Sequence, residues 1–437
     1  MVRRSEAYMG ERIELDIGPL TAGGAAIGRH EGKAVFVAGA CPGDRVLAEI
    51  VRSRRTFDEA VVVDVLSPSA DRVAPPCPLF GRCGGCQWQH VAYKRQVDDK
   101  RRIVADNLAR IAGLPDVAVG IERSPDPYGT RIKARFRFVA DGRLGFNAAR
   151  SHEIIPVPSC RVCDGRLNAL LGKLQRHLSH LGFFDGEVEL GWSPVESKGA
   201  AALHLDRSSV DAEPLAKALL AALPSLAGVV VQLQGERRAF GETAFHLGVS
   251  PEGRNARHEI DSFWQNHATL NERAKTLAAS HAAALAEKIG RPLDILELYA
   301  GSGNFSLALA PYARSLVAAE SDEIACRTAD ENLREVGVPH RILTRDAEKA
   351  CRSEMEQGSR FDLAMVDPPR AGLREAADGL VELRPMRVIY LSCDSATLAR
   401  DVSRLNKTGY FLVTATMLDF FPQTYHLETL AVFDHLA

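Results

Sequence analysis

The stretch Leu-Asp-Ile-Leu-Glu-Leu-Tyr-Ala-Gly-Ser-Gly-Asn-Phe occupies residues 293–305 and decides the fold class of this chain. An apolar run typical of a buried strand leads directly into a glycine-rich turn that opens a helix. Gly301 and Gly303 let the backbone approach a ligand closely, and the start of the helix offers free N–H groups. The next β-like run ends in Glu320, an acid suited to ribose hydroxyl groups. Strand, turn, helix and distal acid together predict a nucleotide-type cofactor site.

Around this stretch, β-like and helical segments alternate from about residue 266 to the end of the chain. The β-like runs cover residues 293–298, 315–320, 341–346, 361–367, 387–393, 411–417 and 428–434. This alternation predicts a doubly wound, Rossmann-like α/β domain over residues 266–437. An NAD site is less favoured than another nucleotide cofactor, because Ser306 stands where the NAD fingerprint has its third glycine.

Reactive residues follow two of the predicted parallel strands, at the edge where open α/β sheets bind ligands. Asp367 opens an Asp-Pro-Pro turn, and Arg370 stands where amino methyltransferases have an aromatic residue. The thiolate of Cys393 is able to add to carbon 6 of a uracil and so make carbon 5 nucleophilic enough to accept a methyl group. A base must then remove the carbon 5 proton, and the predicted base is Glu428, with His426 as the second candidate.

The motifs at residues 297–305, 367–372, 392–394 and 426–429 together resemble the class I S-adenosylmethionine-dependent RNA (uracil-5-)-methyltransferases. The resemblance implies that Cys393 is the nucleophile and Glu428 the base. It also places Gln265 beside the cofactor and the target base, although His267 replaces the asparagine expected two residues later. The cofactor-binding residues implied by the resemblance are Gln265, Tyr299, Gly301, Gly303, Asn304, Glu320, Asp346 and Asp367. Asp346, expected near the adenine, is equally compatible with a helix N-cap.

A cluster of cysteines indicates a metal site. Cys77, Cys83 and Cys86 form a C-x5-C-x2-C pattern with two glycines, and a fourth thiolate must come from Cys160 or Cys163. Four thiolates suit zinc or an iron–sulfur cluster. The Cys-Gly-Gly-Cys-Gln stretch resembles the [4Fe–4S] motif of the ribosomal RNA branch of the uracil-5 family. That resemblance implies a structural [4Fe–4S] cluster rather than zinc, with Cys160 as the fourth ligand.

The N-terminal region alternates short β-like runs with glycine turns and predicts a small β-barrel over residues 1–68. It resembles a TRAM domain, an OB-like barrel that binds RNA, and Arg52, Arg54 and Arg55 are candidate phosphate contacts. A proline-rich joint at 67–76 marks the boundary with a central α+β domain, 69–265, which carries the cysteine cluster. A helix predicted at 91–112 is a candidate to pack on the catalytic domain.

A basic stretch in the central domain alternates strictly, and in a strand its four cations would share one face: Arg131, Lys133, Arg135 and Arg137. Like charges on one face repel unless an anion lies between them. The stretch therefore favours phosphate binding over a merely solvated charged face.

Composition limits the remaining possibilities. The 437 residues are 46% hydrophobic with a formal net charge of −2, which excludes a histone-like binder of nucleic acid. No run of about 18 apolar residues is present, and the N-terminus lacks the apolar core of a secretory signal, so we expect a cytoplasmic protein without membrane association. The predicted substrate is 23S ribosomal RNA, with transfer RNA as the alternative, and a monomer is expected. The competing hypothesis is a non-catalytic iron–sulfur RNA-binding module.

Overall fold

The computed structural model describes residues 9–139, 142–178, 185–206, 210–249 and 255–436. Two compact units make up the chain. Unit 1 comprises Met1–Ile103, Asn147–Ile155 and Phe421–His426, and unit 2 comprises Val104–Phe146, Pro156–Phe420 and Leu427–Ala437.

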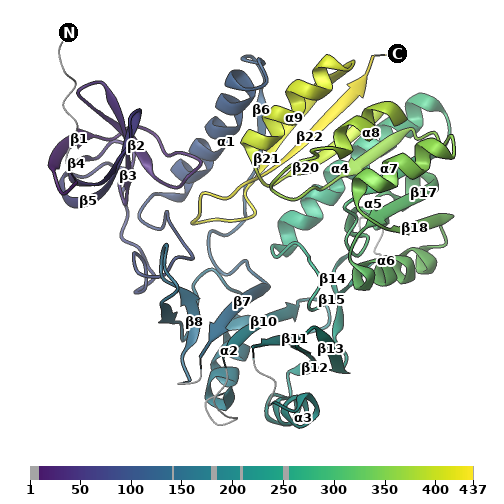
Figure 1. Ribbon diagram of the computed structural model, residues 1–437, viewed down its shortest axis with the longest axis horizontal. Coiled ribbons are helices and arrows are strands. Elements are labelled where there is room, and N and C mark those ends of the chain that lie inside the picture. The colour runs from purple at the N-terminus through teal and green to yellow at the C-terminus, as the bar shows by residue number, and fades with distance from the viewer. Residues whose placement is uncertain (1–8, 140–141, 179–184, 207–209, 250–254, 437) are drawn as a thin grey trace. The chain divides into compact units, whose positions relative to one another are not determined.

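Unit 1 contains a five-stranded sheet with the order β1-β4-β5-β3-β2 (Figure 1). The strands are β1 (Arg12–Asp16), β2 (Ala26–His30), β3 (Lys33–Ala38), β4 (Arg45–Ser53) and β5 (Phe57–Ser67). Neighbouring strands are antiparallel except for β3 and β5, which are parallel. Ile13 and Leu15 of β1 are buried while Arg12, Glu14 and Asp16 are exposed, as expected for a strand with one face on a core.

A long helix, α1 (Tyr93–Arg110), follows the cysteine-rich segment. The predicted helix over 91–112 corresponds to it. In its C-terminal half, Asn107 Nδ2 donates a hydrogen bond of 2.8 Å to Ser395 Oγ. This bond ties the end of α1 to the start of α9 (Ser395–Lys407).

A seven-stranded sheet, most of it in unit 2, has the order β13-β12-β11-β10-β7-β8-β9. Its strands are β7 (Lys133–Phe138), β8 (Leu144–Asn147), β9 (Ile154–Pro156), β10 (Gly186–Ser193), β11 (Lys198–Leu205), β12 (Leu226–Leu233) and β13 (Glu236–Gly241). Helices α2 (Gly165–Leu178) and α3 (Ala212–Ala222) pack on it. The hairpin β14 (Ala244–Val249) and β15 (Asn255–Glu259) contributes Phe245, which packs with Ile132, Val230 and Trp264.

The second sheet of unit 2 has eight strands in the order β18-β17-β16-β19-β20-β22-β21-β6. Its strands are β6 (Val119–Glu122), β16 (Leu293–Leu298), β17 (Ala313–Glu320), β18 (His340–Thr344), β19 (Leu363–Val366), β20 (Arg387–Ser392), β21 (Tyr410–Leu418) and β22 (Glu428–His435). Strands β16 to β20 run parallel, and β22 runs antiparallel to both β20 and β21. The predicted α/β architecture is confirmed, but β6 joins this sheet from the segment that the sequence assigned to the central domain.

Helices flank this second sheet. They are α4 (Ala268–Ile289), α5 (Asn304–Leu309), α6 (Glu323–Val336), α7 (Ala347–Glu356), α8 (Ala376–Leu383) and α9, with a short 3-10 helix at Ala310–Tyr312. The chain leaves β16 toward β17 on one side, while β19 lies on the other side of β16. The carboxyl ends of β16 and β19 therefore border the crevice in which open sheets bind ligands. Among the described residues, no helix has the length and apolarity of a membrane span.

Candidate active site

The glycine-rich turn after β16 adopts the backbone that its sequence predicts. Gly301 and Gly303 have φ of +54° and +80°, in the left-handed region that glycine tolerates best. A Cβ added at Gly301 would meet no atom within 4 Å, so this face of the turn is open. Gly301 N donates a 3.0 Å hydrogen bond to Glu320 Oε2. The structure thus brings the turn and the distal acid together, as the sequence predicted.

Beside the turn lies a cavity of about 430 Å³ whose lining includes Tyr299, Asp346 and Leu373. A volume of this size is in the range of small-molecule sites. Asp346 also accepts a 2.9 Å hydrogen bond from Lys349 N and is the N-cap of α7, so the capping role is confirmed, and its place near the adenine stays a prediction. The open turn, the oriented Glu320 and the adjoining cavity fit an S-adenosylmethionine site.

Side-chain amides attach the glycine-rich turn to neighbouring elements. Asn304 and Asn271 exchange two side-chain hydrogen bonds of 2.9 Å, which attach the turn to α4. Asn332 Nδ2 of α6 donates to Ser302 O at 2.8 Å and to Arg257 O at 2.9 Å. Sequence reasoning missed Asn332 because a lone asparagine in a helix carries no motif.

Another residue missed from the sequence is Glu297, which lies at the end of β16 and is 2% exposed. The hydroxyl of Ser306 donates a hydrogen bond to its carboxyl group. Burial is the main cause that raises the pKa of Glu297 to about 8, and the charges of Asp367 and Glu320 act in the same direction. This side chain is therefore a buried, mostly protonated acid close to the predicted site.

The predicted nucleophile and base lie at the same end of two adjacent strands. Cys393 directly follows β20, and Glu428 is the first residue of β22. Ser392 pairs with Thr429 in the antiparallel register, so the residues next to them in sequence come to one edge of the sheet. Asp367 follows β19, the neighbour of β20, at that edge. His426, the second candidate base, groups instead with unit 1, where its ring centroid lies 4.2 Å from that of Tyr425.

Burial dominates the electrostatics of this edge. Glu428 is 3% exposed, and its Oε2 has no hydrogen-bond partner in the described part of the chain. Burial is the main cause that raises the pKa of Glu428 well above its usual value, and the charge of Asp367 acts in the same direction. Burial raises the pKa of Asp367 to about 7, although a 3.4 Å hydrogen bond from Gln265 Nε2 acts to lower it. Burial, Glu428 and Asp367 raise the pKa of Cys393 to about 12, and Arg370 opposes them. A carboxyl oxygen without a partner, in a group whose charge acts on the Cys393 thiol, suits proton transfer.

His267 shows how the chain accommodates a residue that departs from the family pattern. Its Nδ1 accepts a 3.3 Å hydrogen bond from Leu270 N, and it is the N-cap of α4. Its Nε2 lies 2.8 Å from Ser124 Oγ. Burial lowers the pKa of His267 to about 4, so the ring is neutral and can accept the capping hydrogen bond, as an asparagine oxygen does.

The cysteines of the predicted cluster divide between the two units. Cys77, Cys83 and Cys86 belong to unit 1, whereas Cys160 and Cys163 belong to unit 2. A hydrogen bond from the Cys163 thiol is the main cause that lowers the pKa of Cys160. Within the described ranges, no group of three or more His, Cys, Asp or Glu side chains is placed to hold a metal ion. The ligand set therefore stays a prediction from the sequence.

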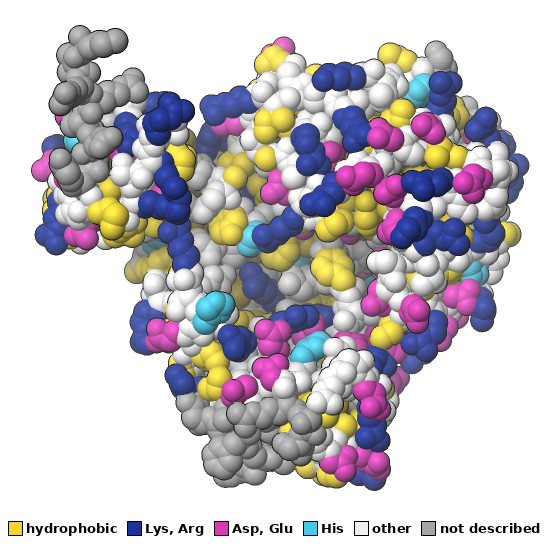
Figure 2. Space-filling view, in the orientation of Figure 1, with side chains coloured by type: hydrophobic (Ala, Val, Ile, Leu, Met, Phe, Trp, Pro, Cys, Tyr) yellow, Lys and Arg dark blue, Asp and Glu magenta, His cyan; other side chains and the backbone are white. Residues whose placement is uncertain are grey.

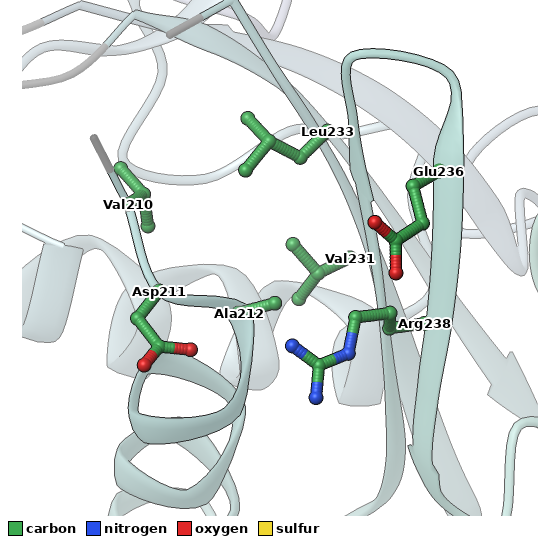
Figure 3. A pocket seen from close by; sticks show the side chains of 7 residues that line it. All are labelled: Val210, Asp211, Ala212, Val231, Leu233, Glu236 and Arg238. Atoms are coloured by element: carbon green, nitrogen blue, oxygen red, sulfur yellow. The ribbon is translucent and has the colours of Figure 1, made fainter. Parts of the chain in front are cut away.

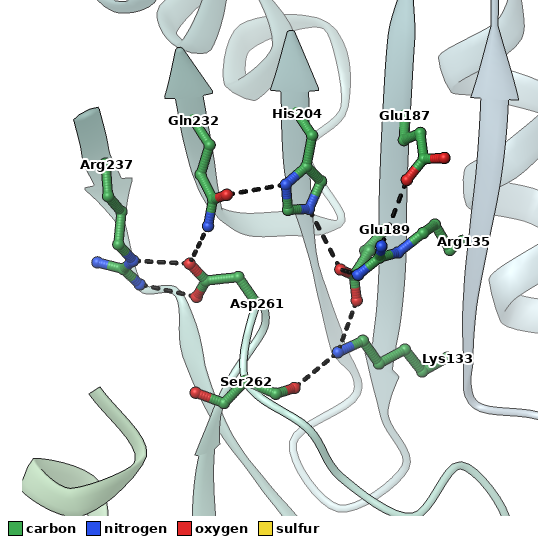
Figure 4. Close-up of polar contacts among 9 residues, drawn as sticks. All are labelled: Lys133, Arg135, Glu187, Glu189, His204, Gln232, Arg237, Asp261 and Ser262. Atoms are coloured by element: carbon green, nitrogen blue, oxygen red, sulfur yellow. Dashed lines mark hydrogen bonds and ion pairs between the residues drawn. The ribbon is translucent and has the colours of Figure 1, made fainter. Parts of the chain in front are cut away.

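Acidic side chains on a neighbouring strand neutralise the positive charge of the basic stretch in the central sheet. Arg131 precedes β7 and lies outside the strand, which begins at Lys133. Glu189 of β10 lies opposite Arg135 in the antiparallel register and forms ion pairs with both Arg135 and Lys133 (Figure 4). The premise that four like charges repel on this face is wrong, because Glu187 and Glu189 alternate on the neighbouring strand. On the face of the molecule in Figure 2, basic and acidic side chains are likewise interspersed.

A second cavity, of about 260 Å³, lies between the start of α3 and strands β12 and β13 (Figure 3). Its lining residues are Val210, Asp211, Ala212, Val231, Leu233, Glu236 and Arg238. It includes none of the predicted site residues.

Comparisons with known proteins agree with the geometry. A family model described as tRNA (Uracil-5-)-methyltransferase matches residues 245–435, and one described as TRAM domain matches residues 6–63. The 23S rRNA (uracil(1939)-C(5))-methyltransferase RlmD of Aeromonas salmonicida is 31% identical over 435 residues, covering 97% of each chain. The protein of the same name from Halomonas elongata is 33% identical over 465 residues, covering 99% of this chain and 92% of the relative.

One solved structure is similar over almost the whole chain. It is the Pyrococcus abyssi tRNA (uracil-54, C5)-methyltransferase in complex with S-adenosyl-L-homocysteine, which is 20% identical with a TM-score of 0.73 and covers 96% of this chain and 100% of the other. This likeness supports the fold. With an N-terminal TRAM domain and full-length relatives above 30% identity, the chain belongs to the RNA (uracil-5-)-methyltransferase family and is an S-adenosylmethionine-dependent enzyme.

Proposed function

We propose that this enzyme transfers a methyl group to carbon 5 of a uridine in 23S ribosomal RNA. Several of the relatives that match over almost the full length are named for that reaction on that RNA. The observation that carries the chemistry is the buried carboxyl group of Glu428, which has an oxygen without a partner among the described residues and raises the pKa of the Cys393 thiol. A thiol and a proton acceptor at one sheet edge are what methylation of an unreactive uracil carbon requires.

The proposed reaction begins when the thiol of Cys393 gives up its proton to solvent and the thiolate adds to carbon 6 of the uracil, which makes carbon 5 an enolate-like nucleophile. Tyr299, Gly301, Gly303, Asn304, Glu320 and Asp346 would hold S-adenosylmethionine, which would supply the electrophilic methyl group. Carbon 5 takes that methyl group as the methyl–sulfur bond breaks, which leaves S-adenosylhomocysteine. Glu428 then removes the proton from carbon 5, and the carbon 6–sulfur bond breaks to release the thiolate. Every bond made to Cys393 is thus broken again, and the net change is a methyl group in place of a proton.

Gln265 and Asp367 are proposed to hold the uracil for this sequence. Their hydrogen bond of 3.4 Å is long, and a pKa of about 7 lets Asp367 act as donor or acceptor at neutral pH. A base paired inside a helix hides carbons 5 and 6, so the target uridine must be looped out or flipped. The more exposed cations of the central sheet, Arg135 and Arg137, together with Arg131, are proposed phosphate contacts.

We further propose that Cys77, Cys83, Cys86 and Cys160 bind a [4Fe–4S] cluster with a structural role. The lowered pKa of Cys160 favours the thiolate that an iron ligand must supply. Protein purified without oxygen should contain iron and acid-labile sulfide, and Cys160→Ser should lose both while Cys163→Ser retains them. Colourless protein with stoichiometric zinc would replace the iron–sulfur assignment. We propose that the enzyme acts as a monomer in the cytoplasm, where ribosomal RNA is found.

Tritium release from RNA labelled at carbon 5 of uridine tests the proposed reaction directly. Unmodified 23S ribosomal RNA and transfer RNA are offered in parallel to the wild type and to Cys393→Ala. Release from 23S ribosomal RNA by the wild type alone supports the proposal. Release from transfer RNA only would reassign the substrate, and no release from either RNA by protein that binds the cofactor would favour the binding module.

A further inference from the structure

The segment that delivers Gln265 to the site has no regular secondary structure. Residues 261–265 connect β15 to the N-cap of α4 and pass through turns and irregular backbone. The ring of Phe263 is 73% exposed and does not anchor the segment. Gln265, in contrast, must stay within hydrogen-bond reach of Asp367. Contacts with other elements must therefore fix the backbone conformation of this segment.

Lys133 of β7 contacts this segment directly (Figure 4). Its Nζ donates a 2.8 Å hydrogen bond to Ser262 O and lies 5.1 Å from the centroid of the Trp264 ring. The same nitrogen pairs with Glu189 Oε2 at 2.8 Å. The side chain is only 12% exposed, so its charge is directed into the protein rather than toward solvent.

Other contacts hold both sides of this attachment. Asp261 accepts hydrogen bonds of 2.7 and 2.9 Å from the guanidinium of Arg237 and one of 3.0 Å from Gln232 Nε2. The Trp264 ring is buried in the cluster that contains Phe245 and Ile260. The backbone between these two anchors is thereby restricted, and Lys133 bonds to the carbonyl that lies between them.

Glu189 fixes Lys133 in turn. Its carboxylate also accepts hydrogen bonds from Arg135 and, at 3.2 Å, from the His204 ring. Burial alone would raise the pKa of Glu189, but His204, Lys133 and Arg135 outweigh it and hold the value at about 2. The carboxylate is therefore ionised at every working pH and keeps the ammonium group beneath residues 262–264.

We propose that Lys133 is a positioning residue for the methyl transfer: it clamps residues 262–264 and so sets Gln265 against Asp367. It does not bind an RNA phosphate. This inference rests on the proposed function, because Gln265 matters only if a uracil is held there. A misplacement of about 1 Å at a positioning contact is able to lower turnover about 100-fold.

Three lysine or arginine variants separate this role from phosphate binding. Lys133→Met removes the ammonium group and retains most of the side-chain volume. Arg137→Met removes a proposed phosphate contact on the same strand. Lys198→Met removes an exposed lysine of β11 whose ion pair with Glu242 measures 3.3 Å, and it controls for loss of one charge. For each variant, kcat, KM for RNA and the salt dependence of RNA affinity are measured.

We expect Lys133→Met to lower kcat about 10- to 100-fold with an unchanged salt slope, because no phosphate contact is lost. Arg137→Met should raise KM for RNA and reduce the slope by about 0.7 to 0.9. Lys198→Met should match the wild type. A reduced salt slope with unchanged kcat in Lys133→Met would overturn the positioning role and identify a phosphate contact. An inactive wild type would instead refute the proposed function.

Two further measurements keep the test decisive if Lys133→Met folds poorly. The double variant Lys133→Met/Glu189→Gln removes both partners of the ion pair, so that no carboxylate stays buried without the ammonium group. This variant should show the same loss of kcat. A double-mutant cycle with Gln265→Ala should be non-additive, because Lys133 acts through Gln265. Additive losses in that cycle would overturn the proposal, because they would show that Lys133 does not act through Gln265.

Discussion

The high pKa of Cys393 leads to a quantitative prediction for the enzyme without RNA. With a pKa of about 12, about one thiol in 10,000 is ionised at pH 8, against about one in four for a free cysteine with a pKa of about 8.5. The thiolate fraction is thus lower by about 2,000-fold. A more basic thiolate is intrinsically more nucleophilic, and this raises the rate of the ionised form by about 25- to 55-fold. Cys393 should therefore react with a small disulfide about 50- to 100-fold more slowly than free cysteine.

The pH dependence follows with a definite sign. Because the pKa of Cys393 is raised, the reaction should accelerate about tenfold for each pH unit between pH 7 and 10 and should not level off there. Mass spectrometry of the peptide that contains Cys393 measures the rate at this one site, and Cys393→Ser identifies the peptide. Unfolding in guanidinium should restore the rate of free cysteine. A plateau below pH 9 in the folded protein would refute the reasoning, since it would mean that burial and the neighbouring carboxyl groups do not suppress the thiolate.

Three other predictions concern the same half of the molecule. Glu428→Gln should accumulate a covalent RNA adduct through Cys393, visible as a slowly migrating band in a denaturing gel, because proton removal is blocked after methyl transfer; normal turnover would remove Glu428 from the mechanism. Because the pKa of Glu297 is raised in the folded state, the folded protein keeps a proton that the unfolded chain has lost. The free energy of unfolding should therefore fall by about 1.4 kcal/mol per pH unit between pH 5 and 8. Glu297→Gln should reduce this slope. Asn332→Ala should raise KM for S-adenosylmethionine about tenfold with a smaller effect on kcat, because the turn loses the hydrogen bond from Asn332 to Ser302 O. An unchanged KM would show that the turn keeps its conformation without this hydrogen bond.

The cofactor turn was predictable from the sequence because its determinants are local. Residues 293–305 contain the strand, the glycines and the helix start in one stretch, and backbone sterics allow few other conformations for Gly301 and Gly303. The edge at which Asp367 and Cys393 lie was predictable for a related reason: a residue that follows a parallel strand must lie at the carboxyl edge of the sheet.

Contacts between distant segments were not predictable in the same way. The pairing of Arg135 with Glu189 depends on an antiparallel register between strands more than 50 residues apart, and no periodicity within one strand encodes it. The alternating acids at 187 and 189 were visible in the sequence, but their partner strand was not. The cap formed by His267 depends on the burial that keeps its ring neutral, which only packing determines.

Strand β6 has a consequence for how the catalytic half of the molecule is made. It pairs in parallel with β21, matching Val119 with Ala415 and Glu122 with Leu418, although nearly 300 residues separate the two strands. During synthesis, β6 emerges early and must wait for almost all of the remaining chain before its partner exists. Expression of residues 266–437 alone would leave one side of β21 without its neighbour, an open edge that favours association between copies. A fragment intended for crystallisation or engineering should therefore begin ahead of Val104, where unit 2 itself begins.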